Sequence, residues 1–140
     1  PMTATLDTAR AFFEACETGQ GWSGCAAYCT PDASFSSQAE PLADVETLEG
    51  YADWMKRLLG PLPDGHYELK AFAHDPERNS VSAFATFHGT HTGVGGPVPP
   101  TGKPVAADYV YVMEFGDGDR IRHMTKIWNA GWSLRELGWG

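Results

Sequence analysis

The stretch SVSAFATFHGTHTGVGGPVPPTGKPVAADYVYVMEF, residues 80–115, decides the fold class of this chain. Near its two ends, residues 80–93 and 107–115 have the apolar content, alternation and length that are typical of β-strands. Between them lies VGGPVPPTGK, residues 94–103, whose glycines and prolines predict a loop. The stretch therefore predicts two strands joined by a loop rich in glycine and proline.

Two more strand-like segments flank this stretch. Residues 66–74 precede it across the turn DPERN, and residues 120–129 follow it across the turn GDGD. Tight turns of this kind join neighbouring antiparallel strands. The second half of the chain therefore predicts four long strands in hairpin order.

Helical patterns come earlier in the chain. Residues 6–19 carry apolar residues at helical spacing, residues 21–29 predict a second, short helix, and residues 44–60 give the clearest helix, with Asp44 or Thr47 as its cap. A short strand is expected at residues 33–38, and a short helix after the last strand. This order predicts one α+β domain, residues 1–140, in which helices pack on one face of a curved antiparallel sheet.

Composition excludes several classes of function. The net charge is −8, whereas nucleic-acid grooves and anionic membrane surfaces are recognised by clustered Lys and Arg. No apolar run reaches the roughly 18 residues of a membrane helix, and residues 1–16 lack the pattern of a signal peptide. The three cysteines, an odd number, are expected to be buried free thiols. We therefore expect a cytoplasmic protein without nucleic-acid or membrane partners.

Three motifs resemble the SnoaL-like polyketide cyclase group of the nuclear-transport-factor-two-like superfamily. They are GTHTGVGGPVPPTGK at residues 89–103, YVYVMEFGDGDRI at 109–121 and SLRELG at 133–138. The resemblance implies a cone-shaped sheet with the N-terminal helices on its concave face, an apolar pocket inside the cone, and usually a homodimer. It also implies cofactor-independent ring closure of an apolar carbonyl compound, with neither metal nor cofactor.

Two positions depart from the pattern of that family. The family's catalytic Asp, eight residues before the Leu-Gly pair, corresponds to Asn129, and the His that faces it corresponds to Tyr111. Phenol and amide groups donate hydrogen bonds, so Tyr111 and Asn129 could together form an oxyanion hole. His91 is the candidate general base, because its ordinary pKa suits proton transfer near neutrality. Alternatively, His91 only holds the loop by hydrogen bonds.

Strand alternation suggests which other residues line the pocket. Tyr109, Tyr111 and Met113 share one face of their strand. On the next strand, Ile127 shares a face with Asn129, and we expect that face to point inward. Tyr51 and Trp54, on the predicted helix at residues 44–60, would form an aromatic lid over the cone. The alternatives are that the tyrosines are ordinary strand residues and that the aromatic residues of the helix belong to the core.

Two classes of function remain open. The first is a cofactor-free cyclase, isomerase or lyase, and the second is a non-catalytic binding or assembly protein, since an amide at position 129 cannot act as a base. We lean towards the enzyme because donors occupy the positions that catalysis would use. For the homodimer, the residues expected on the outer face of the sheet are Phe72, Phe84 and Trp128.

Overall fold

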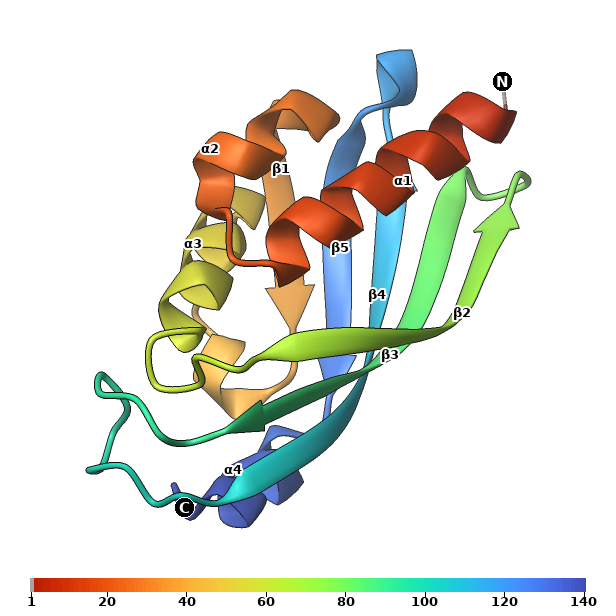
Figure 1. The fold of residues 1–140 in the computed structure, drawn as a ribbon. Helices are drawn as coiled ribbons and strands as arrows, with labels where there is room; N and C mark the ends of the chain where they lie inside the picture. The colour runs from red at the N-terminus through yellow and green to blue at the C-terminus, as the bar shows by residue number, and fades with distance from the viewer. Residues whose placement is uncertain (1) are drawn as a thin grey trace.

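The computed structural model describes residues 2–140 (Figure 1). Three helices and one strand come first, and four strands and a last helix follow, which confirms the predicted order. In chain order the main elements are α1 (Met2–Glu17), α2 (Gly21–Cys25), β1 (Cys29–Ser37), α3 (Leu48–Leu58), β2 (His66–Asp75), β3 (Ser80–Thr90), β4 (Pro104–Phe115), β5 (Ile121–Trp128) and α4 (Ala130–Leu137). Short 3-10 turns lie at Ala26–Tyr28, Glu40–Leu42 and Asp117–Asp119.

The five strands form one curved sheet in the order β1-β5-β4-β3-β2. Strands β2 to β5 pair antiparallel with their neighbours in sequence, as their predicted hairpin order requires. Strand β1 pairs parallel to β5, so the sheet is mixed rather than wholly antiparallel. Because no hairpin links β1 to β5, nothing in the local sequence fixed its direction. The α+β class and the curved sheet are confirmed, and the direction of this edge strand is the correction.

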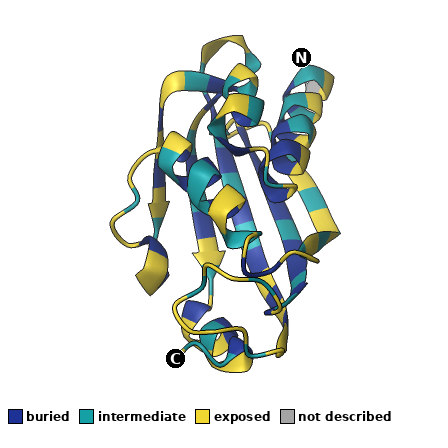
Figure 2. Cartoon of the chain, turned by 60° about the vertical axis from the view of Figure 1, so that its left-hand side comes forward, coloured by how far each residue is buried: buried dark blue, intermediate teal, exposed yellow. Residues whose placement is uncertain are grey.

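The helices cover the concave face of the sheet. In Figure 1, α1 runs obliquely across the sheet, and α3 lies beside β1. Helix α1 buries Phe12 and Phe13 completely, and α3 buries Leu48 and Met55. Figure 2 shows buried residues along the strands beneath the helices, with exposed residues on the outer turns of the helices. The Thr47 side chain caps α3 by accepting a hydrogen bond from the Gly50 amide at 3.0 Å.

One end of the sheet is closed by the β3–β4 loop, α4 and the C-terminus (Figure 1). The loop is tied to the C-terminus by hydrogen bonds from Trp139 to His91 (2.8 Å) and from Thr101 to the Leu137 carbonyl (2.7 Å). It also rests on the turn after α3, where the Gly93 amide donates to the Pro61 carbonyl at 3.0 Å. These contacts place the glycine- and proline-rich segment beside the concave face of the sheet.

The three cysteines are buried and free, as expected. Within residues 2–140, no helix combines the length and the apolar character that crossing a membrane requires.

Candidate functional site

A cavity of about 470 Å³ lies at the closed end of the sheet, a volume within the roughly 300–1,000 Å³ of ligand pockets. Helices α3 and α4, the β3–β4 loop and the inner faces of β3, β4 and β5 contribute its walls. Most of the lining is apolar and includes Trp54, Met55, Leu58, Phe87, Trp128 and Leu134. The polar and charged side chains in the lining are Glu17, Arg57, Tyr109, Lys126 and Ser133. Such a cavity suits an apolar ligand that carries one polar group.

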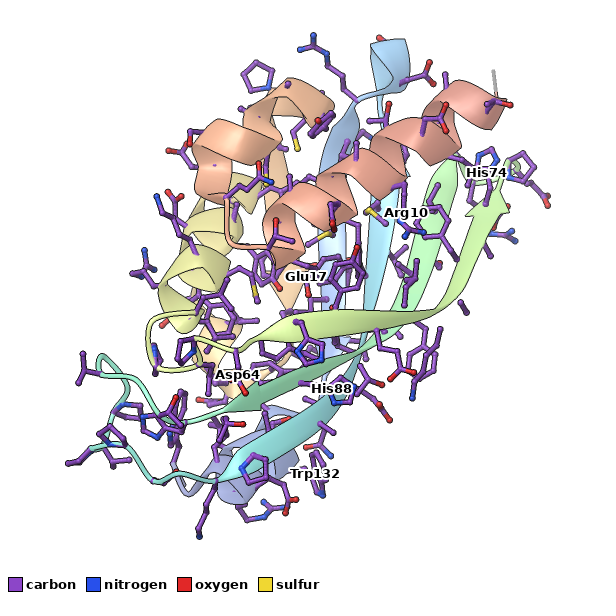
Figure 3. The ribbon with its side chains drawn as sticks, viewed as in Figure 1. Arg10, Glu17, Asp64, His74, His88 and Trp132 are labelled. Atoms are coloured by element: carbon purple, nitrogen blue, oxygen red, sulfur yellow. The ribbon has the colours of Figure 1, made fainter. Side chains whose placement is uncertain are left out.

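Glu17, the last residue of α1, brings a carboxylate to this cavity. It lies one helical turn after Phe13, so it shares the inward face of α1, and only 2% of it is exposed. Figure 3 shows it between the end of α1 and the sheet. Tyr109 donates a hydrogen bond to Oε1 and Tyr111 donates one to Oε2. Alternation on β4 places both phenols on the concave face, so each carboxylate oxygen has its own donor.

The charge of Glu17 is finely balanced by its surroundings. Burial raises the pKa of this carboxyl above its ordinary value, because the ionised form loses its hydration. The positive charge of Lys126 and the hydrogen bonds from Tyr109 and Tyr111 lower the pKa again and partly offset the effect of burial. A carboxyl group with a raised pKa inside a cavity is typical of general acid–base sites.

Lys126 supplies a buried amine to the same cavity from strand β5. Its Nζ donates a hydrogen bond to the Tyr51 hydroxyl at 3.0 Å, and only 6% of the residue is exposed. Burial lowers the pKa of Lys126 to about 8, and the Glu17 carboxylate acts in the opposite direction. Five aromatic rings lie 4.6–6.0 Å from Nζ: Trp128, Tyr51, Trp54, Tyr109 and Tyr111.

The amine and the carboxylate are joined by a directed chain of hydrogen bonds. Tyr111 gives its one hydroxyl proton to Glu17, so in its contact with Tyr51 the Tyr111 oxygen must accept. Tyr51 therefore donates to Tyr111, and its own oxygen accepts from Lys126. Every donor in the chain points towards Glu17, which stabilises the carboxylate form. The two tyrosines lie behind the cavity wall and could pass a proton between the amine and the carboxylate.

Several residues expected at the site do meet there. Trp54 and Tyr109 line the cavity, and Tyr51 and Tyr111 form the layer behind it. Met113 is fully buried on the same face of β4, but it lies outside the cavity lining. Its face was predicted correctly, whereas its contact with a ligand stays a prediction.

The expected inward face of β5 is wrong. Asn129 is exposed and caps α4, where its side chain accepts a hydrogen bond from the Trp132 amide at 3.1 Å. Ile127 is 62% exposed on the outer face of the sheet. The inward residues are Met124, Lys126 and Trp128. A displacement of one residue exchanges the two faces of a strand, and this is the error that the motif count made.

His91 is fully buried but lies outside the cavity lining. Its Nδ1 accepts hydrogen bonds from the Trp139 indole at 2.8 Å and from the Thr101 amide at 3.3 Å. These contacts hold the β3–β4 loop against the C-terminus. The geometry favours the anchoring interpretation of His91, and its role as a base stays a hypothesis.

Sequence reasoning missed Glu17 and Lys126, the two groups with the strongest chemistry. A weak signal was present for both of them. Glu17 follows the apolar stripe of α1 at the spacing from Phe13 that keeps it on the buried face. Lys126 alternates with Met124 and Trp128, so it interrupts an apolar face of β5.

Comparison with known proteins identifies the family to which this chain belongs. The sequence profile of a family described as SnoaL-like domain matches residues 9–124. No match was found among the curated proteins.

Solved structures share the fold at low sequence identity. A candidate SnoaL-like polyketide cyclase from Jannaschia sp. CCS1 has a TM-score of 0.80 and 18% identity, and the match covers 98% of this chain and 94% of that one. AclR, a candidate hydroxylase from Streptomyces galilaeus, has a TM-score of 0.78 and 24% identity, and the match covers 99% of this chain and 83% of that one. IdmH, a candidate polyketide cyclase from Streptomyces antibioticus, has a TM-score of 0.77 and 22% identity, and the match covers 96% of this chain and 98% of that one.

Proposed function

Because the chain belongs to the SnoaL-like domain family, we propose that its cavity binds an apolar carbonyl compound and catalyses cofactor-independent proton transfer on it. The reaction class is cyclisation or isomerisation through an enolate. The observation that carries the proposal is the buried Glu17 carboxylate, which is held by two phenols beside a buried lysine at the wall of an apolar cavity.

In this proposal Glu17 is the general base. It takes a proton from the carbon next to the ligand's carbonyl group, and the negative charge moves to the carbonyl oxygen. Once Glu17 is protonated, it needs fewer donors, so the Tyr109 hydroxyl is free to turn towards the enolate oxygen. Lys126 adds positive charge to the same wall. Reprotonation at another carbon gives an isomer, and attack of the enolate on a second carbonyl closes a ring.

The second function considered from the sequence, non-catalytic binding, rested on the amide at position 129. That residue lies on the surface at the start of α4 and does not line the cavity. Its identity therefore has no bearing on whether the cavity contains a base. Non-catalytic binding is accordingly one outcome of the experiment below, without an observation in its favour.

Exchange of α-hydrogens tests the proposal without knowledge of the natural substrate. The bicyclic ketone β-tetralone would be incubated with the protein in deuterium oxide, and exchange followed by proton NMR. Wild type is expected to accelerate exchange, and Glu17→Gln to slow it by roughly 10²–10⁴-fold. Glu14→Gln is the matched control, because exposed Glu14 lies on the same helix and also accepts a tyrosine hydroxyl, from Tyr67 at 2.6 Å.

The outcomes separate the two functions. Binding of β-tetralone without exchange would support a binding protein and contradict the catalytic proposal. If β-tetralone neither binds nor exchanges, that result would contradict the catalytic proposal and the binding protein alike.

We also propose the homodimer, supported by a row of apolar residues on the outer face of the sheet. Phe84, Val110 and Ile127 are register partners across β3, β4 and β5. Trp128, which was expected there, lines the cavity instead, and Phe72 lies under Arg10 of α1, 5.9 Å from its guanidinium. Sedimentation of wild type at micromolar concentration should show a dimer, and Ile127→Glu should shift it towards monomer.

The cytoplasmic location also stays a proposal. It is supported by the three free thiols, which would persist in a reducing compartment.

A further inference from the structure

We propose that Lys126 is an amine nucleophile that forms an iminium ion with an aldehyde or ketone bound in the cavity. This inference rests on the proposed function, because it uses the same cavity and the same class of carbonyl ligand. It adds a covalent step that the acid–base proposal does not need.

Lys126 differs from every other lysine of the chain in its position. Lys56, Lys70 and Lys103 are exposed, whereas Lys126 is buried and lines the cavity together with Glu17. A carbonyl ligand that fills the cavity therefore meets one amine only. A hydrated surface ammonium is a poor nucleophile because its nitrogen lone pair holds a proton, and burial lowers the cost of losing that proton.

The contacts of Nζ leave the lone pair of the neutral amine available. One N–H is held by the Tyr51 hydroxyl at 3.0 Å. Within residues 2–140, the ion pairs shorter than 4 Å do not include Lys126. A direct carboxylate partner would fix the proton on the amine. With a phenol as its anchor, Nζ is oriented while its lone pair is free to attack a carbon in the cavity.

The surrounding rings favour the product of this attack. Trp128, Tyr51 and Trp54 have their centroids 4.6, 5.1 and 5.3 Å from Nζ. Aromatic faces stabilise a cation within about 6 Å. An iminium ion keeps the positive charge close to the position of Nζ, so the rings that now face the ammonium would face the iminium.

The step balances with the groups present. The Lys126 nitrogen attacks the carbonyl carbon, and the π-electron pair of the carbonyl group moves to oxygen. The ammonium first gives one proton to Glu17 through Tyr51 and Tyr111, which frees the lone pair for this attack. After the attack the nitrogen gives up a second proton by the same route, and the carbinolamine oxygen takes up both protons and leaves as water. Overall, R₂C=O and Lys–NH₃⁺ give R₂C=NH⁺–Lys and H₂O, without an oxidant or reductant.

The iminium defines the class of substrate. It withdraws electrons from the neighbouring carbon more strongly than the parent carbonyl group does, so an α-hydrogen there becomes acidic enough for the Glu17 carboxylate to remove. The product of that step is an enamine. The site therefore fits an aldehyde or ketone that has an α-hydrogen and an apolar body for the cavity. A carbonyl compound without an α-hydrogen would be trapped at the iminium stage.

Reductive trapping tests this directly. Wild type would be incubated near pH 7 with β-naphthaldehyde, which has no α-hydrogen, and sodium cyanoborohydride, followed by intact-mass measurement and peptide mapping. We expect one adduct, with a mass gain equal to the aldehyde minus one oxygen atom, on the peptide that contains Lys126. The exposed lysines of the same molecule serve as internal controls. Lys126→Met should lose the adduct and Lys70→Met should keep it.

The mapping on wild type keeps the test valid even if Lys126→Met folds poorly. Labelling spread over the exposed lysines, or no labelling, overturns the inference. If Glu17-dependent exchange of β-tetralone is observed at the same time, the proposed function stands and only the covalent step is wrong. An adduct at Lys126 without any such exchange would support the amine site and contradict Glu17 as the base. If neither the adduct nor the exchange is observed, both the covalent step and the proposed function are contradicted.

Discussion

Lys126 and Tyr111 are register partners on β5 and β4, and their polar ends belong to one chain of hydrogen bonds. The link between them is the hydroxyl of Tyr51, which comes from α3. Two strands and two helices thus meet at a few polar atoms inside an apolar core. A buried network of this kind rigidifies a site when each member is satisfied, and it is costly when one member is removed.

Tyr111→Phe should weaken both the fold and the base. The substitution leaves the Oε2 atom of Glu17 without its donor, at a cost of about 1–3 kcal/mol in the free energy of unfolding. Because the lost hydrogen bond lowers the pKa of Glu17, that pKa should rise further. The rising limb of the pH profile for β-tetralone exchange should then move to higher pH. Denaturant unfolding and the exchange profile measure the two effects.

Tyr67→Phe is the matched control for this prediction. Tyr67 donates to the exposed Glu14 rather than to Glu17, so its loss should leave the exchange profile unchanged. A Tyr111→Phe protein with wild-type stability and an unmoved profile would show that the bond to Glu17 has no energetic weight.

Lys126 should make stability depend on pH in the alkaline range. Its pKa is about 8 in the folded protein against an ordinary 10.5, so the folded state favours the neutral amine. The contribution to stability is therefore present above pH 10.5 and is lost as the pH falls through 8. The difference between these two pKa values corresponds to about 3 kcal/mol in the free energy of unfolding. The free energy of unfolding of wild type relative to Lys126→Met should rise between roughly pH 7 and 9.5, before the tyrosines of the unfolded chain ionise.

Other titratable groups near Nζ do not cancel this rise of the free energy of unfolding with pH. Glu17, Cys16, Tyr51, Tyr109 and Tyr111 lie around it, and the pKa values of all three tyrosines are raised by burial. The exposed Lys70→Met serves as the comparison and should follow wild type at each pH. Parallel curves for wild type and Lys126→Met would rule out a buried, perturbed amine.

Asn129→Ala should destabilise the protein without changing its chemistry. Loss of a helix cap of this kind costs about 1 kcal/mol, and here the cap is the hydrogen bond to the Trp132 amide. Asn129→Asp should keep most of the stability, because a carboxylate also caps a helix. Exchange of β-tetralone should be the same in wild type and both variants. A large fall in exchange for Asn129→Ala alone, in folded protein, would return this residue to the active site.

The sequence predicted the elements well because each of them repeats a simple period. The face of β5 was predicted wrongly because of how the end of the strand was assigned. Asn129 was located by counting back from the Leu137-Gly138 pair and was taken as an inward strand residue, whereas β5 ends at Trp128 and Asn129 caps α4. Alternation counted from that position exchanged the two faces of the strand.

The chemistry of the site was hidden for a different reason. Glu17 and Lys126 are 109 positions apart in the sequence, and each has the appearance of an ordinary charged surface residue. Only the packing of α1 across the sheet brings both to one cavity. Tyr109 and Tyr111 were found because alternation placed them together on one strand. The partner of those phenols could not be found, since nothing local in the sequence ties β4 to the end of α1.

His91 offers the sharpest test of base against anchor. If it holds the β3–β4 loop through Trp139 and Thr101, His91→Ala should loosen the loop residues Gly95 and Gly96, which line the cavity. The concentration of β-tetralone needed for half-maximal exchange should rise several-fold, while the maximal rate and its pH profile stay close to wild type. His88→Ala is the control, because that half-buried histidine of β3 contacts Glu68 at 3.2 Å and is not part of the loop anchor. A fall in maximal rate together with a lost or displaced limb of the pH profile would make His91 the base and would remove that role from Glu17.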